Sequence, residues 1–153
     1  SITKIKKIVN NKVKLIINDF PEIAAKLNCD GCHIGQKDLS IQQTKQIMKS
    51  NKIIGVTCHN SKELALSAEK YGASYLAFGS FFKTKTKKTK FKANPKLLQW
   101  AHKNLKTPVV AIGGINEENY KLLLQNGAKY IACSSYIWRN SKYNPLKALN
   151  QLK

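Results

Sequence analysis

Short apolar segments alternate with helical patterns along almost the whole chain. The apolar segments are rich in β-branched and aromatic residues and lack a clean polar alternation, which indicates strands that are covered on both faces. Strict repetition of strand and helix is typical of a parallel α/β sheet or barrel. The sequence therefore predicts one α/β domain over residues 1–153 with about six strand–helix units. The predicted strands are residues 13–17, 31–35, 52–56, 75–79, 108–112 and 130–134.

Cap residues and glycines predict where several helices begin and end. Asn60, with Glu63 three positions later, has the spacing of a capping box for a helix over residues 63–71. Asn94 and Asn144 each precede a proline, which suits the first helical turn. Asn116 is followed by two acidic residues and predicts a helix that ends at Gly127.

Charge and hydropathy limit the classes of partner. The chain has 27 Lys and Arg against 8 Asp and Glu, a formal net charge of +19, which favours nucleic acid or small phosphorylated molecules as partners. The lysines are scattered along the sequence, so a solvated basic surface is the favoured interpretation and a nucleic-acid partner is not expected. No apolar run is long enough to span a bilayer and the N-terminal stretch lacks a signal-peptide core, so we expect a cytoplasmic protein.

Polar or glycine-rich residues follow every predicted strand. In parallel α/β folds, ligands bind at the carboxyl ends of the strands, so these residues are the candidates for function. Gly113-Gly114 and Ser134-Ser135 follow the last two predicted strands, where barrels commonly bind phosphate. Asp19 and Asp38 could share a magnesium ion with substrate phosphate oxygens, and the alternative for either residue is helix capping.

One short motif suggests different chemistry. Cys29-x-x-Cys32-His33 has the spacing of a covalent haem attachment site, and the same residues could form a metal site or a redox dithiol. A cytoplasmic chain favours free thiols instead. We therefore expect no haem, metal or disulfide at this motif, and we expect Cys58 and Cys133 to be small buried apolar residues.

Five motifs in order resemble one enzyme family. They are Leu15-Ile-Ile-Asn-Asp19, Asp30-Gly-Cys-His-Ile-Gly-Gln-Lys-Asp38, Ile53-Ile-Gly-Val-Thr57, Gly79-Ser-Phe-Phe-Lys-Thr-Lys-Thr-Lys87 and Pro108-Val-Val-Ala-Ile-Gly-Gly-Ile115. Over residues 13–137 the chain resembles thiamine phosphate synthase and its relatives, the thiazole tautomerases. The resemblance implies a TIM barrel and a transferase that joins hydroxymethylpyrimidine diphosphate to hydroxyethylthiazole phosphate. Diphosphate would leave first, and the thiazole nitrogen would then capture the pyrimidine cation.

The resemblance also implies roles for individual residues. Asp19 and Asp38 match the family's magnesium ligands, and Asn18 and Thr57 match its pyrimidine contacts. Lys87 matches the lysine that contacts the diphosphate, and with Thr57 it is the expected catalytic residue. The matches to the site of the thiazole phosphate are Thr84, Lys85, Thr86, Gly114, Ser134 and Ser135.

The chain also departs from the family pattern. A full member has eight strands, and its second strand carries a Gln-x-Arg-x-Lys motif for the diphosphate. The first two units have no counterpart here, and residues 1–12 resemble the helix before the third strand. The chain begins at Ser1, which suggests a fragment or a degenerate copy, and its open sheet edges predict self-association. Phe81 and Phe82 occupy positions where the family usually has prolines.

Two other functions remain open at this stage. A thiazole tautomerase would share the barrel, need no diphosphate site and could use His59 as an acid–base group. A catalytically inactive protein that binds anions or nucleic acid would explain the charge and the missing strands, and salt would weaken its binding.

Overall fold

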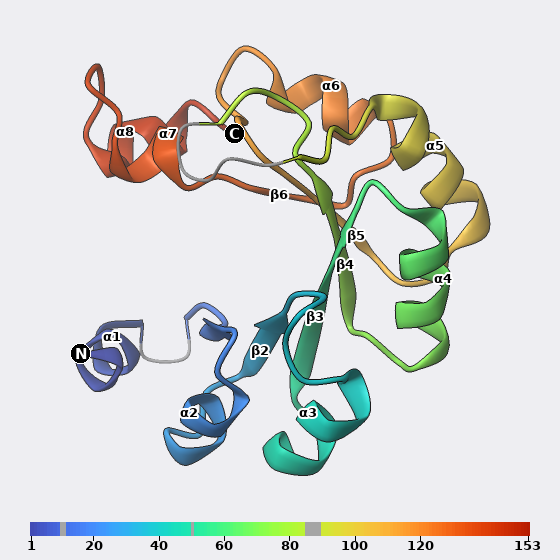
Figure 1. The fold of residues 1–153 in the computed structure, drawn as a ribbon. Helices are drawn as coiled ribbons and strands as arrows, with labels where there is room; N and C mark the ends of the chain where they lie inside the picture. The colour runs from blue at the N-terminus through green and yellow to red at the C-terminus, as the bar shows by residue number, and fades with distance from the viewer. Residues whose placement is uncertain (10–11, 50, 85–89) are drawn as a thin grey trace.

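A computed structural model describes residues 1–9, 12–49, 51–84 and 90–153 of the chain. The described strands form one parallel sheet in the order β1-β2-β3-β4-β5-β6, so the predicted α/β fold is confirmed (Figure 1). The strands are β1 (Ile16–Asn18), β2 (Gly31–Ile34), β3 (Ile53–His59), β4 (Tyr75–Gly79), β5 (Val109–Ile112) and β6 (Tyr130–Ala132). The helices are α1 (Ile2–Val9), α2 (Pro21–Lys26), α3 (Ile41–Met48), α4 (Lys62–Lys70), α5 (Pro95–Asn104), α6 (Tyr120–Gln125), α7 (Ser135–Trp138) and α8 (Pro145–Asn150).

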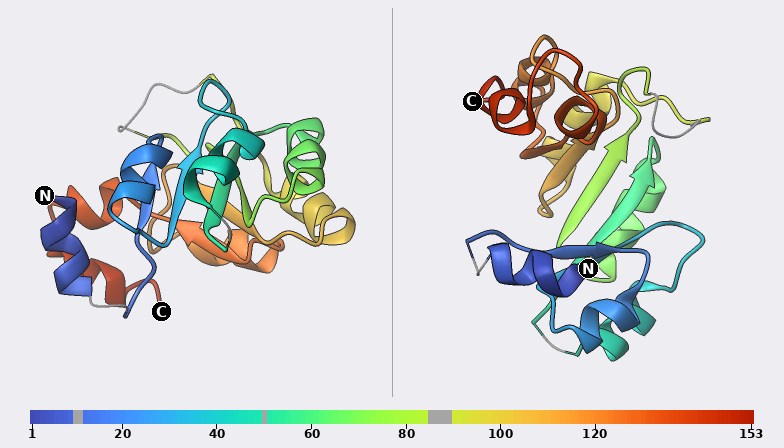
Figure 2. Two further views of the ribbon diagram at one scale, coloured as in Figure 1. Left: turned by 90° about the horizontal axis from the view of Figure 1, so that it is seen from below. Right: turned by 90° about the vertical axis from the view of Figure 1, so that its left-hand side faces the viewer.

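The sheet curls into part of a TIM-like barrel, with helices along its outer side and β1 and β6 at its two ends (Figures 1 and 2). Each strand pairs with the next one in the sequence, which is the connectivity of a (β/α) barrel. None of the helices in the described ranges combines the length and the hydropathy that a membrane span requires.

The two faces of the sheet differ in burial. Side chains that face the helices are buried, such as Cys32 on β2 and Val109 on β5. Side chains on the inner face are more open, and Ile112 at the end of β5 is 42% exposed. The prediction that strands are covered on both faces therefore holds for β4, where Ala77 on the inner face is 4% exposed, and is wrong at the carboxyl end of β5. The reason is that no described element packs across the inside of the curled sheet (Figure 2).

Two of the four predicted helix starts agree with the structure. Asn144 caps α8 by accepting a hydrogen bond from the Lys147 backbone N–H at 2.9 Å. Asn94 stands at the predicted N-terminal position of α5, although its side chain makes no capping bond there.

Two predicted helix starts are wrong. The N-cap of α4 is Ser61, whose Oγ accepts from the Leu64 N–H at 3.1 Å, because a hydroxyl at this position reaches the third N–H better than Asn60 one residue earlier. Helix α6 begins at Tyr120, because Asn116 forms a turn in which its Oδ1 accepts from the Glu118 N–H at 3.0 Å.

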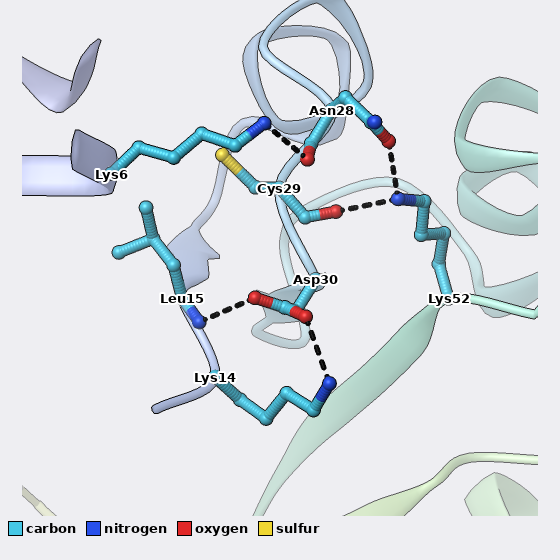
Figure 3. Close-up of polar contacts among 7 residues, drawn as sticks. All are labelled: Lys6, Lys14, Leu15, Asn28, Cys29, Asp30 and Lys52. Carbon is cyan, nitrogen blue, oxygen red and sulfur yellow. Dashed lines mark hydrogen bonds and ion pairs between the residues drawn. The ribbon is translucent and has the colours of Figure 1, made fainter. Parts of the chain in front are cut away.

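Hydrogen bonds from charged side chains connect the segments at the amino ends of β1, β2 and β3 (Figure 3). Lys6 of α1 donates to the carbonyl oxygens of Leu27 and Asn28 at 2.7 and 2.8 Å, where α2 ends. Lys52, just before β3, donates to the Cys29 carbonyl oxygen at 2.8 Å. The lysines therefore satisfy carbonyl groups of the loop that connects α2 to β2.

Asp30 holds the start of β1 against the start of β2. Its carboxylate accepts from the Leu15 backbone N–H at 2.9 Å and from Lys14 Nζ at 3.1 Å (Figure 3). The hydrogen bond from Leu15, and then the one from Lys14, lower the pKa of Asp30 below its ordinary value of 3.8.

We expect Asp30→Asn to lower the free energy of unfolding by about 1 kcal/mol at pH 7. Because the pKa of Asp30 is lower in the folded state, its stabilisation is full above the ordinary value and is lost as pH falls through the folded value. Urea unfolding of the native chain at pH 7 and at pH 3 measures the difference, which should shrink at the lower pH. Glu118→Gln, which removes an exposed carboxylate, is the matched control. An equal effect of both substitutions would contradict the role of Asp30.

Candidate functional site

Asn18, Asp19 and Asp38 lie at the carboxyl ends of β1 and β2. Asn18 is opposite His33 in the β1–β2 register, and the Asp19 N–H donates to the His33 carbonyl oxygen at 2.8 Å. Asp38 Oδ2 accepts a hydrogen bond from the Gly35 N–H at 2.7 Å. This hydrogen bond closes the turn that follows β2. Two predicted magnesium ligands therefore follow neighbouring strands at the same end of the sheet.

Neither aspartate is a helix cap. The N-cap of α2 is Phe20, which makes no side-chain capping bond, and the N-cap of α3 is Ser40, which forms a complete capping box with Gln43. Among the described residues the Asp19 carboxylate has no hydrogen-bond partner. Helix capping, the alternative role for Asp19 and Asp38, is therefore excluded.

The two carboxylates affect the pKa values of two side chains of β2, Cys32 and His33. Burial raises the pKa of the Cys32 thiol to about 11, and the negative charges of Asp19 and Asp38 add to this effect. Burial lowers the pKa of His33, and the same two charges only partly oppose it. Burial therefore favours the neutral form of both side chains, and the two carboxylates beside them can attract a cation.

His33 connects the side chains of two other strands on the inner face of the sheet. Its Nε2 lies 2.8 Å from Thr57 Oγ1 on β3, and its Nδ1 lies 2.9 Å from the Tyr75 hydroxyl on β4. The His33 and Tyr75 rings stack with centroids 5.5 Å apart. Thr57, the predicted pyrimidine contact, is thus held by a hydrogen-bonded chain across β2, β3 and β4.

Tyr75 and Gln36 belong to this arrangement, and the sequence did not identify them as site residues. Gln36 donates through Nε2 to the Thr57 carbonyl oxygen at 2.5 Å. Any Cβ on Gly55 would overlap the Tyr75 ring, so the glycine leaves the space through which Tyr75 reaches His33. A lone glycine inside a strand often marks such a close approach, and Gly55 was the available signal.

Gly113 and Gly114 lie against the segment that follows β4. Both have positive φ, 103° and 66°, which favours glycine. A Cβ on Gly114 would stand 2.5 Å from the Lys83 carbonyl oxygen and 2.8 Å from the Phe82 Cβ. The loop after β5 therefore packs tightly against residues 82–83, at the start of the Lys- and Thr-rich segment.

Phe81 and Phe82 use backbone hydrogen bonds that prolines cannot make. The Phe81 N–H donates to the Ile112 carbonyl oxygen at 3.1 Å, and the Phe82 N–H donates to the Gly113 carbonyl oxygen at 3.0 Å. Both rings also pack against the core. The departure from the family's prolines is thus compensated by two hydrogen bonds to the end of β5.

Ser134 and Ser135 stand where β6 passes into α7. Ser134 is the N-cap of α7 and its side chain makes no capping hydrogen bond. In the β5–β6 register Ile112 is opposite Ala132, so the two serines and Gly114 follow neighbouring strand ends. Thr84 is the last described residue before the gap, and the predicted site residues Lys85, Thr86 and Lys87 lie outside the described residues.

His59 takes no part in the His33 chain of hydrogen bonds. It ends β3 with a φ of 51°, and its ring stacks on Phe91 with centroids 4.1 Å apart. Burial lowers the pKa of His59. Its described ring contact is with the segment that leads into α5, and not with Thr57 or the aspartates.

The cysteine motif is not arranged for cofactor chemistry. Cys29 and Cys32 are 1% and 0% exposed and are free thiols, so neither sulfur is accessible for attachment of a haem. Within the described ranges no group of three or more His, Cys, Asp or Glu side chains could hold a metal ion. Cys58 is fully buried as predicted, and burial raises its pKa to about 12, whereas Cys133 is only partly buried.

Two surface hollows in the described part of the chain lie at the other end of the sheet. One, of about 440 Å³, lies before β3 and is lined by Lys45, Gln46, Lys49, Asn51 and Lys52. The other, of about 400 Å³, lies between α5 and α6 beside Thr107 and Lys129, which precede β5 and β6. Neither hollow contains a predicted site residue, and neither holds a converging set of catalytic groups.

Comparisons with known proteins agree with this architecture and place the chain in a family. A solved structure of thiamine phosphate pyrophosphorylase from Pyrococcus furiosus superposes with a TM-score of 0.87 at 31% identity and covers 98% of this chain and 71% of that chain. A 3-hexulose-6-phosphate synthase superposes at 18% identity with a TM-score of 0.69, which shows the shared fold.

Two relatives with similar sequences are thiamine-phosphate synthases. The thiamine-phosphate synthase of Pelagibacter ubique (strain HTCC1062) is 56% identical over 98% of this chain and 72% of its own length. That of Rhodospirillum centenum (strain ATCC 51521 / SW) is 43% identical over 84% of this chain, which spans 62% of that relative. The family model described as thiamine monophosphate synthase matches residues 1–137. The predicted family and incomplete barrel are confirmed, and the chain belongs to the thiamine monophosphate synthase family.

Proposed function

We propose that this chain supplies most of the active site of a thiamine-phosphate synthase, a magnesium-dependent transferase. The reaction joins hydroxymethylpyrimidine diphosphate to hydroxyethylthiazole phosphate and releases diphosphate. One observation carries the proposal: Asp19 and Asp38 follow neighbouring strands and neither is used as a helix cap. The names of the relatives and the +19 charge support an enzyme that acts on phosphorylated substrates, and its cytoplasmic location is part of the proposal.

The donor set at Asp19 and Asp38 fits magnesium. This ion is commonly held by one or two carboxylates, with water and substrate phosphate oxygens completing its coordination. Bound there, Mg²⁺ would neutralise the negative charge that develops on the departing diphosphate. The protein's part is to hold the two carboxylates in place, which the hydrogen bond from the Gly35 N–H does for Asp38.

The remaining side chains would bind the two substrates. Asn18 and Thr57 would contact the pyrimidine, and Lys87 would contact the diphosphate and assist its departure. Gly114 offers backbone without a side chain after β5, and the two serines follow β6, the strand paired with β5. These features support a site for the thiazole phosphate at Thr84, Lys85, Thr86, Gly114, Ser134 and Ser135.

The test is thiamine phosphate formation by the full native chain, with Mg²⁺ and again with a chelator. We expect product with Mg²⁺ and none with the chelator. Product that is unaffected by the chelator would contradict the role of the aspartates. Turnover of a thiazole carboxylate phosphate isomer alone would favour the tautomerase, and DNA retention that is lost at modest salt, without turnover, would favour an anion-binding protein.

Self-association stays a prediction for the same preparation. The apolar side chains at the open sheet, such as Ile112 and Tyr130, are 42% and 55% exposed. Light scattering of the full native chain at several concentrations measures it directly.

A further inference from the structure

The hydrogen-bonded chain from Tyr75 through His33 to Thr57 has a direction. In the tautomer that carries its proton on Nε2, the His33 imidazole accepts a hydrogen bond at Nδ1 and donates one at Nε2. Its two ring nitrogens have different partners, Tyr75 at Nδ1 and Thr57 at Nε2. The position of the ring proton decides whether the Thr57 hydroxyl can donate a hydrogen bond to a ligand or is used as the donor to His33.

The Tyr75 end fixes the direction. Within the described residues, the Tyr75 hydroxyl has one polar partner, His33 Nδ1 at 2.9 Å. A phenol keeps its proton at neutral pH, burial raises the pKa of Tyr75 further, to about 12, and His33 Nδ1 is the acceptor within reach among the described residues. Tyr75 therefore donates to Nδ1, and His33 carries its own proton on Nε2 and donates it to Thr57 Oγ1.

We propose that His33 is a positioning residue that fixes the Thr57 hydroxyl as a hydrogen-bond donor toward a ring nitrogen of the bound pyrimidine. Thr57 receives a hydrogen bond from Nε2 and its own O–H proton remains free. The Gln36 amide holds the Thr57 carbonyl oxygen, so both the backbone and the hydroxyl of this residue are anchored. The inference rests on the proposed function, because it assigns the orientation of that site's pyrimidine contact.

The chain of hydrogen bonds is built into the sheet. His33 is opposite Gly55 in the β2–β3 register, and the absent side chain of Gly55 makes room for the Tyr75 ring. The stacked rings of His33 and Tyr75 limit rotation of the imidazole. A preorganised donor costs less on binding than a hydroxyl that must be oriented by the substrate.

The first test needs no substrate. Nitrogen NMR of the full native chain labelled with ¹⁵N-histidine reports which ring nitrogen is protonated, and His33→Gln assigns the signal. We expect His33 neutral with its proton on Nε2, and we expect Tyr75→Phe, which removes one oxygen atom, to produce a mixture of tautomers. A proton on Nδ1 in the unmodified protein would overturn the proposed direction.

The second test separates the two substrates. We expect His33→Leu to raise the KM for the pyrimidine diphosphate about tenfold and to leave the KM for the thiazole phosphate unchanged. His33→Gln keeps an N–H near the position of Nε2 and should recover most of the loss, and Tyr75→Phe should show a smaller loss of the same kind. His102→Gln on α5 is the matched control.

The outcomes are distinguishable. Equal changes in both KM values, or no change with His33→Leu and with Tyr75→Phe, would overturn the positioning role. If the full native chain makes no thiamine phosphate, the proposed function fails, while the NMR result still decides the direction of the hydrogen bonds. If His33→Leu does not fold, Tyr75→Phe decides the kinetic test.

Discussion

Replacing Asp38 with Asn should lower the rate of thiamine phosphate formation at least about 100-fold at a fixed Mg²⁺ concentration. The asparagine Oδ1 can still accept the hydrogen bond that the Gly35 N–H gives to Asp38 at 2.7 Å, so the turn after β2 should keep its shape. What is lost is one negative charge of the two that would hold the ion. The measurement is initial rate against Mg²⁺ concentration, and we expect half-saturation at a much higher concentration in the variant.

Asp30→Asn is the matched control for Asp38→Asn, because it removes a carboxylate from the opposite end of the same strand pair. We expect it to lower stability and leave the dependence on Mg²⁺ unchanged at temperatures well below its melting point. Calorimetric titration with Mg²⁺ in the presence of diphosphate gives a second readout. An unchanged Mg²⁺ affinity in Asp38→Asn would remove this residue from the metal site.

Gly114→Ala is the second substitution with a large expected effect. Its φ of 66° disfavours any side chain, at a cost of about 1–2 kcal/mol. The new Cβ would also meet the Lys83 carbonyl oxygen, which is backbone and cannot turn away. We expect the loop after β5 and the segment after β4 to separate, which should raise the KM for the thiazole phosphate at least about tenfold.

Gly72→Ala separates backbone strain from damage to the site. Gly72 also has a positive φ, 78°, but its Cβ would meet only the end of the flexible Lys45 side chain. We expect both substitutions to lower the melting temperature and only Gly114→Ala to raise the KM for the thiazole phosphate. Equal KM values in the two variants would show that Gly114 does not contribute to phosphate binding.

Sequence periodicity was sufficient to locate the six strands along the chain. Strands that pack against helices need apolar side chains, and these are visible in the sequence as short apolar segments. The β4 strand was predicted at its exact bounds, and the other strands differ by a few residues at their ends. Helix starts follow less directly from the sequence. Asn60 and Ser61 are both residue types that favour the N-cap position, and only the backbone geometry shows that Ser61 is the N-cap of α4.

The carboxylates at the strand ends were predicted as magnesium ligands or as helix caps, and the sequence alone could not choose between the two. That choice depends on which residue occupies each N-cap, and Phe20 and Ser40 occupy them. The Cys29-x-x-Cys32-His33 motif is expected to hold no cofactor, and the structure adds that both of its thiols are buried.

The sequence by itself determined the α/β repeat, the family resemblance and the residues at the strand ends, because these follow from local periodicity and short motifs. Only the tertiary structure decided that His33 joins Thr57 to Tyr75, two residues from different strands. It also decided that Gly55 leaves the space for that contact and that Gly113 and Gly114 lie against residues 80–83. The physical reason is that such contacts depend on strand register and sheet curvature, which place side chains far apart in the sequence on one inner face.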